Sequence, residues 1–454
     1  MQVSDIWTKS LTPDLLDLAI IAFYLLIIFI ISHYIKKKHI YTNPAYQYYV
    51  YGLFASIVGA IALGLVYNFY YPGGDTTGYY RSSEAMVNLL RSDYKAYFRL
   101  LFGDLSPEAL SAFTAETGKP WYTHDYGAFA IVRITSIFTL LGFKNYFTAS
   151  ILFAWFFYIG YWKLYLLFCN FYPKYYKQLA IPILFFPSVL FWGSGILKDT
   201  VTLAALAWFI YAIYFLIVKK KFVIPNIIAI LLLGYILLVV KPYIVVALMP
   251  GLAIWAGWHY LSKIDNPLIK FFISPLILVL FLVLGISSLS LFSENLGIYG
   301  SMEGIIQKAI ITYEDHLRFE QYGTNFYSLG EFDGTLSNFL AKTPAAVVAG
   351  LFRPFVWEAE STFVLLSAIE NALLLIFVLY VFLKNGPVRF MRIAFKEPMV
   401  IFSLSFAFIF AFAVGVSSGN FGALVRLKIP MIPFFVASFV IIFMKSRESQ
   451  DELK

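Results

Sequence analysis

The chain has 454 residues, of which 60% are hydrophobic and 13% are charged. Several apolar runs reach the roughly 20 residues that a helix needs to cross a bilayer, so the composition predicts an all-α polytopic integral membrane protein, with one membrane domain over residues 1–454. The net charge of +8 does not indicate nucleic-acid binding, because the Lys and Arg residues are concentrated in short loops between the apolar runs, where the positive-inside rule places them.

The N-terminal segment does not have the pattern of a cleavable signal peptide. Residues 1–13 lack a basic n-region, and no small-residue cleavage site follows the first apolar run, Leu15–Ile35. The cluster Lys36-Lys37-Lys38 follows that run, which predicts that the N-terminus lies outside. The second run, Tyr48–Tyr70, then returns the chain to the outer face. The expected location is a bacterial inner membrane, with the C-terminus in the cytoplasm.

A polar first outer segment, residues 71–145, follows the second run. It opens with the turn Gly73-Gly74-Asp75, which places a carboxylate at the mouth of a span. Further along, Gly127–Gly142 is apolar and carries Arg133 in its middle. It is shorter than a span, and if it crossed the bilayer the later basic loops would move outside. We therefore expect it to lie on the outer surface as an amphipathic interfacial helix.

The rest of the chain predicts further spans, about eleven in all, and a second large outer segment over residues 293–360. The further spans are Tyr146–Phe168, Leu179–Trp192, Val201–Val218, Phe222–Val240, Pro242–Tyr260, Phe271–Phe292, Thr362–Leu383, Met399–Val416 and Met431–Met444. No segment resembles a soluble domain or an internal repeat.

This topology brings a set of polar residues to the outer face: Asp75, Lys198, Asp199, Arg353, Glu358, Asn420 and Arg426. Lys and Arg are uncommon at outer helix ends, so their presence there indicates a partner. A lipid-linked phosphate is a suitable partner, because Arg binds it through two parallel hydrogen bonds and Lys binds it as a point charge. A carboxylate nearby can act as a general base toward an acceptor hydroxyl.

The order of elements resembles the GT-C superfamily of membrane glycosyltransferases, in particular bacterial relatives of the protein-mannosyltransferase type. The stretch Gly74–Tyr79 is similar to the acidic residue and tyrosine that open the family's first outer loop. Gly127–Gly142, with Arg133, is similar to the short apolar segment that ends that loop. Pro187–Asp199 looks like a variant of a later outer turn, and Arg426, which precedes a proline, looks like the start of the family's last span.

The resemblance implies that Asp75 is the catalytic residue and that Lys198, Arg426 and Arg353 bind the carrier phosphate. The other expected substrate contacts are Tyr79, Arg81, Asp199 and Asn420. Two departures stand out. The run Leu15–Ile35 would be an additional helix, and Asp75 stands alone where the family often has two acids. The need for a divalent metal and the identity of the base therefore stay open.

The cysteine and histidine content contains no metal-binding motif. Cys169 is the only cysteine, and the five histidines include no HxxxH or HExxH pair. These observations exclude an intramolecular disulfide and argue against a thiolate cluster or an all-protein zinc site. We expect no cofactor.

Each candidate residue also has a purely structural interpretation. Asp75 suits an Asx turn, Asp199 suits the first turn of a helix, and Arg426 suits a snorkelling anchor. For Arg353 the structural interpretation, an interfacial anchor paired with an acid, is the stronger one.

Three further polar sites are expected to be structural. Glu370 and Asn371 lie deep in a predicted span, so they should face the bundle and hold helices together. His124-Asp125 is a candidate acceptor-site pair, but an exposed loop is the stronger expectation for it.

The leading hypothesis is a glycosyltransferase of the hexosyltransferase type. It would move a sugar from a polyprenyl-phosphate carrier to a glycan, lipid or protein acceptor on the outer face. A polymerase that joins lipid-linked oligosaccharide units would use the same face and stays an alternative. A lipid-glycan transporter or flippase ranks third, because such proteins tend to have repeats and charges at the bilayer midplane. A non-catalytic scaffold also stays open.

Overall fold

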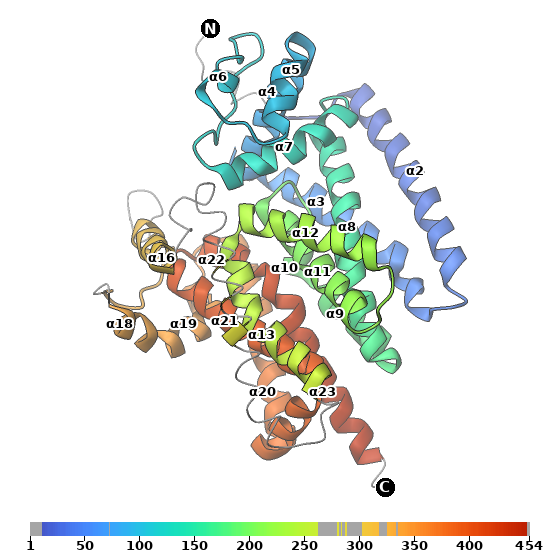
Figure 1. Ribbon diagram of the computed structural model, residues 1–454, viewed down its shortest axis with the longest axis vertical. Helices are drawn as coiled ribbons and strands as arrows, with labels where there is room; N and C mark the ends of the chain where they lie inside the picture. The colour runs from blue at the N-terminus through green and yellow to red at the C-terminus, as the bar shows by residue number, and fades with distance from the viewer. Residues whose placement is uncertain are drawn as a thin grey trace. The chain divides into compact units, whose positions relative to one another are not determined.

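The computed structural model describes residues 11–71, 73–261, 279, 280, 283, 287, 302–316, 325–332 and 335–451. Within these residues the chain is helical, and the only β-type pairing is an isolated bridge between Phe326 and Asn420 (Figure 1). Eight of the described helical segments are long and apolar enough to cross a membrane. The expectation of an all-α, membrane-embedded protein is therefore confirmed.

The described chain packs as two compact units. Unit 1 comprises residues 1–166 and 189–211, and unit 2 comprises residues 167–188 and 212–454. The helices of unit 1 are α2 (Leu15–His39), η1 (Pro44–Tyr48), α3 (Tyr49–Leu65), η2 (Val66–Tyr70), α4 (Asp75–Ser92), α5 (Tyr94–Leu101), α6 (Pro107–Leu110) and α7 (Tyr126–Leu141). Parts of α8 (Tyr146–Phe171), α10 (Pro187–Trp192) and α11 (Lys198–Ile217) complete the unit.

Unit 2 contains the remaining parts of those three helices and most of the C-terminal half. Its other helices are η3 (Pro173–Tyr175), α9 (Tyr176–Leu184), α12 (Val223–Val240), α13 (Pro242–Leu261), α16 (Met302–His316), α18 (Leu336–Ala341), α19 (Thr343–Phe352), η5 (Val356–Glu358), α20 (Thr362–Lys396), α21 (Pro398–Ser417), α22 (Phe421–Leu427), η6 (Ile429–Met431) and α23 (Ile432–Asp451).

The eight candidate spans account for most of the predicted ones. They are Leu15–His39, Pro44–Tyr70, Tyr146–Phe171, Lys198–Ile217, Val223–Val240, Thr362–Lys396, Pro398–Ser417 and Phe421–Glu448. The predicted span Pro242–Tyr260 corresponds to α13, of which Pro242–Trp255 counts as a shorter apolar helix. The predicted span Phe271–Phe292 lies outside the described residues apart from four isolated positions. The predicted total stays a prediction.

The predicted span Leu179–Trp192 is not a single helix. Helix α9 ends at Leu184 and α10 begins at Pro187, and Phe185 between them has φ −128° and ψ 11°. A residue that precedes proline is disfavoured in the helical region, so Phe186 is a natural place for the chain to leave the helix. Hydropathy gave one apolar run here because it does not register that backbone constraint.

The segment 71–145 forms a helical layer within unit 1. Helices α4 and α7 pack against each other, and Ser83 and Thr139 share a buried hydrogen bond of 2.7 Å. Helix α7 has 16 residues, which agrees with the expectation that it is shorter than a span. More than half of its residues are buried, however. It is therefore a packed helix with an exposed end at Ile137, Leu140 and Leu141, and its placement on a membrane surface stays a prediction.

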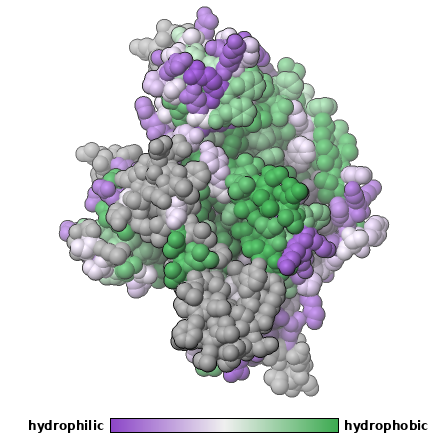
Figure 2. All heavy atoms as spheres, in the orientation of Figure 1, coloured by the Kyte–Doolittle hydropathy of each residue, from purple (hydrophilic) through white to green (hydrophobic). Residues whose placement is uncertain are grey.

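The surface of unit 1 changes in character along the unit. Figure 2 shows hydrophilic residues over the region of α5 and α6 and hydrophobic residues along α2. Only 11% of the apolar window of α2 is buried, as expected for a helix whose side chains contact lipid.

Unit 2 holds α19 and α21 at close range through small residues. A Cβ atom added at Gly415 would lie 2.0 Å from the carbonyl oxygen of Ala346, and one added at Gly350 would lie 2.3 Å from that of Ala411. Small residues let membrane helices approach to backbone contact. This contact fixes α19, and with it the segment that carries Arg353.

Candidate functional site

The turn that precedes α4 depends on two glycines. Gly73 has φ +128° and Gly74 has φ +135°, a region that residues with a side chain rarely adopt. A Cβ atom at Gly74 would also lie 2.5 Å from the ring of Tyr67. The turn follows the π-helical segment η2, a form that is frequent at functional sites. It places half-buried Asp75 at the first position of α4, where the helix dipole favours a carboxylate.

Aromatic rings surround this turn. Tyr67 contacts Trp192 with ring centroids 6.4 Å apart, and Trp192 ends α10. One turn into α4, Tyr79 lies 4.7 Å from Tyr122, and the Tyr122 hydroxyl would be 2.5 Å from a Cβ atom at Gly78. Tyr79 is buried, so its expected role as a substrate contact has no exposed surface to support it.

The segment that contains Tyr122 also carries an ion pair. Lys198 Nζ lies 2.8 Å from Asp125 Oδ2, and the two side chains are 18% and 57% exposed. Asp125 Oδ1 accepts a hydrogen bond of 2.8 Å from the Ala128 backbone N–H, which caps the start of α7. Burial raises the pKa of Asp125, but Lys198 and the backbone N–H groups of Ala128 and Gly127 outweigh it and hold the pKa below its ordinary value. Asp125 is therefore a poor proton acceptor.

These contacts connect the segments of three predicted site residues of unit 1, Asp75, Tyr79 and Lys198. Tyr67 and Trp192 connect the turn at Asp75 to the segment that leads into Lys198, and the loop from Tyr122 to Asp125 connects α4 to Lys198 itself. We call Asp75, Tyr79, Asp125 and Lys198 the unit 1 site. The expectation that Asp125 lies in an exposed loop is confirmed, since the residue precedes α7 and its side chain is 57% exposed. Its local sequence gave no sign of Lys198, which lies 73 residues further on.

The two remaining candidates of unit 1 have other surroundings. Arg81 forms an ion pair of 3.3 Å with Glu84, one turn along α4. Asp199 is fully buried in the first turn of α11, in agreement with its structural interpretation. The structure places neither side chain among the exposed groups of the unit 1 site.

Arg353, in unit 2, is held by an acid and by aromatic rings. Its guanidinium forms a bidentate pair with Glu358, in which Nε lies 2.9 Å from Oε1. Its Cζ lies 5.0 Å from the ring centroid of Tyr327 and 5.9 Å from that of Phe421. The expected anchor with an ion pair is confirmed in its ion pair, and a phosphate would have to compete with Glu358.

Asn420 and Arg426 lie at the two ends of α22. Asn420 is buried and caps the helix, since its Oδ1 accepts from Ala423 N at 3.1 Å and its Nδ2 donates to Asn325 O at 2.9 Å. Arg426 lies in the last turn of that helix, where a cation is stabilised by the helix dipole. Burial, together with the charge of Arg426, holds the pKa of His316 below its ordinary value.

Unit 2 also contains a buried lysine, Lys428, that the sequence did not indicate as a candidate. Lys428 is 1% exposed, and its Nζ lies 2.6 Å from Asn371 Oδ1, 3.2 Å from Arg353 O and 3.4 Å from Leu351 O. On the adjacent position of α20, Glu370 Oε2 accepts a hydrogen bond of 2.8 Å from the Ser188 backbone N–H. Glu370 and Asn371 therefore hold segments of unit 2 together, as predicted.

Within the described ranges, no group of three or more His, Cys, Asp or Glu residues could hold a metal ion. Comparisons of the chain with protein-family models, with curated proteins and with solved structures found no match. A functional proposal therefore rests on the residues of this chain.

Proposed function

We propose that the protein is a membrane glycosyltransferase that moves a sugar from a polyprenyl-phosphate carrier to an acceptor hydroxyl on the outer face of a bacterial inner membrane. The observation that carries the proposal is the unit 1 site, where the Gly73-Gly74-Asp75 turn and the partly exposed Lys198 ammonium belong to segments joined by Tyr67, Trp192 and Tyr122. The resemblance of Gly74–Tyr79 to the opening of a GT-C outer loop supports the same assignment.

The proposed reaction uses two groups of the unit 1 site. Asp75 accepts the proton of the acceptor hydroxyl, and the hydroxyl oxygen bonds to the anomeric carbon of the sugar. The bond between that carbon and the carrier phosphate breaks, and the phosphate leaves with the electron pair. Lys198 stabilises the charge that develops on the phosphate. An ammonium has three donors, so Lys198 can hold Asp125 and a phosphate oxygen together.

Asp125 has a positioning role in this proposal. It holds the Lys198 ammonium at 2.8 Å while its other oxygen caps α7, so the lysine is kept in one place before the carrier arrives. Arg353 and Arg426 stay candidate phosphate contacts. Both residues belong to unit 2, and Arg353 is already paired with Glu358.

The test compares Asp75→Asn with wild type and with Asp104→Asn, a matched change at a carboxylate of the same segment that pairs with exposed Arg99. Each variant replaces the wild-type gene in the native host, and the surface glycans and the lipid-linked intermediates are analysed. Loss of a general base costs roughly 10²–10⁴-fold in rate, so Asp75→Asn should remove the glycan product while Asp104→Asn should not. If Asp75→Asn is expressed normally and the glycans are unchanged, the proposed catalytic role of Asp75 is wrong.

The pattern of intermediates also separates the reaction classes. Loss of one defined sugar is the result expected for a transferase. Accumulation of single lipid-linked repeat units would identify a polymerase instead, and lipid-linked units retained on the cytoplasmic face would identify a flippase.

A further inference from the structure

Lys163 places an ammonium group inside a candidate span of unit 1. It lies in α8, and its Nζ is 4.5 Å from the ring centroid of Tyr211 and 5.9 Å from that of Trp208, both on α11. No ion pair joins it to a carboxylate of the described residues. Cation–π contacts use the ring faces and leave the ammonium able to donate hydrogen bonds to an anion.

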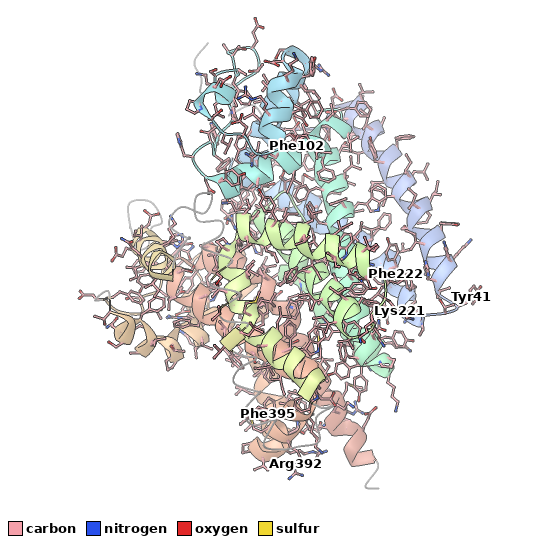
Figure 3. The ribbon with its side chains drawn as sticks, viewed as in Figure 1. Tyr41, Phe102, Lys221, Phe222, Arg392 and Phe395 are labelled. Atoms are coloured by element: carbon pink, nitrogen blue, oxygen red, sulfur yellow. The ribbon has the colours of Figure 1, made fainter. Side chains whose placement is uncertain are left out.

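Neighbouring rings fix the level of Lys163 along the span. The ring of Trp162, the preceding residue, lies 5.0 Å from that of Tyr46 and 4.9 Å from that of Tyr49. Those tyrosines belong to η1 and to the first residue of α3, directly after the turn that follows α2. Figure 3 shows Tyr41 projecting from that turn, away from the helices of unit 1. Lys163 is therefore level with η1 and the start of α3, eight residues before the last residue of α8, Phe171, and among the tyrosine and tryptophan residues that are typical of the membrane–water interface.

This end of unit 1 is positively charged. The last turn of α2 carries Lys36, Lys37, Lys38 and His39. Lys36 Nζ lies over the ring of Tyr51, 5.2 Å from its centroid, so it repeats the lysine-on-aromatic arrangement of Lys163. The sequence contains no Asp or Glu in residues 18–74, 126–166 or 200–211, the parts of unit 1 that include α3, α8 and most of α2 and of the unit 1 part of α11. These segments provide cations and ring faces and no carboxylate to neutralise them.

We propose that Lys163, supported by Tyr211 and Trp208, binds the phosphate of an anionic membrane lipid. A lysine stem lies along apolar surface while its head reaches the headgroup level, and a lipid phosphate supplies the negatively charged oxygens that these segments do not provide. The lipid site is separate from the unit 1 site. Lys198 begins α11 and Trp208 lies roughly 15 Å further along the helix.

The test is native mass spectrometry of the full chain in detergent with phosphatidylglycerol or phosphatidylcholine added. Wild type should retain phosphatidylglycerol about fivefold better than phosphatidylcholine, the ratio expected for about 1 kcal/mol of attraction between one lysine and a lipid of net negative charge. Phosphatidylcholine carries the same phosphate, but its choline group neutralises the charge. Lys163→Gln should lose that preference and Lys163→Arg should keep it. Lys95→Gln, a change at an exposed lysine of α5, should behave as wild type.

Three outcomes would overturn the proposal. They are equal retention of the two lipids by wild type, an unchanged preference in Lys163→Gln, and displacement of the lipid by millimolar inorganic phosphate, which would assign the site to a free anion. Tyr211→Leu provides a second variant if Lys163→Gln does not fold. It removes the nearer ring and keeps the charge, so its preference for phosphatidylglycerol should fall below that of wild type without disappearing.

Discussion

Replacing Asn371 by leucine removes a side-chain acceptor from Lys428, a buried lysine of unit 2. Lys428 Nζ lies 2.6 Å from Asn371 Oδ1, whereas its contacts with the carbonyl oxygens of Arg353 and Leu351 are longer, at 3.2 and 3.4 Å. The substitution therefore removes the shortest hydrogen bond of a buried cation and leaves the cation in place. A hydrogen bond to a charged group contributes about 1.5–3 kcal/mol, so the free energy of unfolding should fall by about 2–3 kcal/mol.

The assay is reversible unfolding of the purified protein in mixed micelles, followed by circular dichroism. Asn385→Leu is a matched control, because it makes the same change in the same helix, where Asn385 Nδ2 donates only to the neutral carbonyl of Val381 at 2.7 Å. Asn385→Leu should lower the free energy of unfolding by only about 1 kcal/mol. The double variant Asn371→Leu with Lys428→Met removes the cation and its acceptor together. It should therefore recover part of the stability that is lost in Asn371→Leu alone.

Two results would refute this reasoning. One is an equal loss of stability in Asn371→Leu and Asn385→Leu, which would mean that the charge of Lys428 is not what Asn371 stabilises. The other is a double variant whose loss equals the sum of the two single losses, which would mean that the two side chains do not interact.

Four further predictions follow from single contacts. Gly74→Ala should lower the free energy of unfolding by about 1–3 kcal/mol through strain at positive φ and contact with Tyr67, and Gly73→Ala, with open space around it, should cost less in the same melt. Asp125 has a lowered pKa, so the stability it contributes is present above the ordinary pKa of Asp and is lost as the pH falls through the lower folded-state value. With 57% of its side chain exposed, Asp125→Ala should reduce the pH 6 to pH 3 stability difference by only about 0.5 kcal/mol. The pKa of His316 is also lowered, so the folded state binds a proton less readily than the unfolded state does. The free energy of unfolding therefore falls as the pH drops below about 6.5. His316→Gln should make this fall smaller in thermal melts between pH 7 and pH 5. Gly415→Leu should prevent the approach of α19 to α21 and lower the yield of folded protein in size-exclusion chromatography, whereas Phe408→Leu, at an exposed position of α21, should not.

Hydropathy predicted most of the spans well, because each span is a long run of apolar residues. Leu15–Ile35 and Val201–Val218 could be placed to within a few residues, since roughly 20 apolar residues in a row have few other uses. The same measure gave the wrong result for Leu179–Trp192, where the backbone preference before Pro187 divides an apolar run into two helices. A proline signal was present in that sequence and would have been enough to predict the break.

The candidate site was predictable in its parts but not in its pairings. Gly73-Gly74-Asp75 could be recognised as a turn from local sequence, because glycines in succession favour positive φ. The pair of Asp125 with Lys198 joins a loop to the first residue of α11, 73 residues later in the chain, and neither segment has a periodicity that points to the other. Lys428 was missed for a different reason. A lysine two residues before a proline near a span end resembles an interfacial anchor, and only the packing of α19 and α20 shows that it is buried.

The interrupted chain path of unit 1 has a consequence for biogenesis. The segment that carries Asp125 emerges from the ribosome early, but its partner Lys198 belongs to the second part of the unit, after residues 167–188 that pack into unit 2. Asp125 and the start of α7 therefore lack their contact with Lys198 while α8, α9 and α10 are synthesised. A nascent chain arrested before α11 should be sensitive to protease in the segment 71–145, and one arrested beyond α11 should be protected.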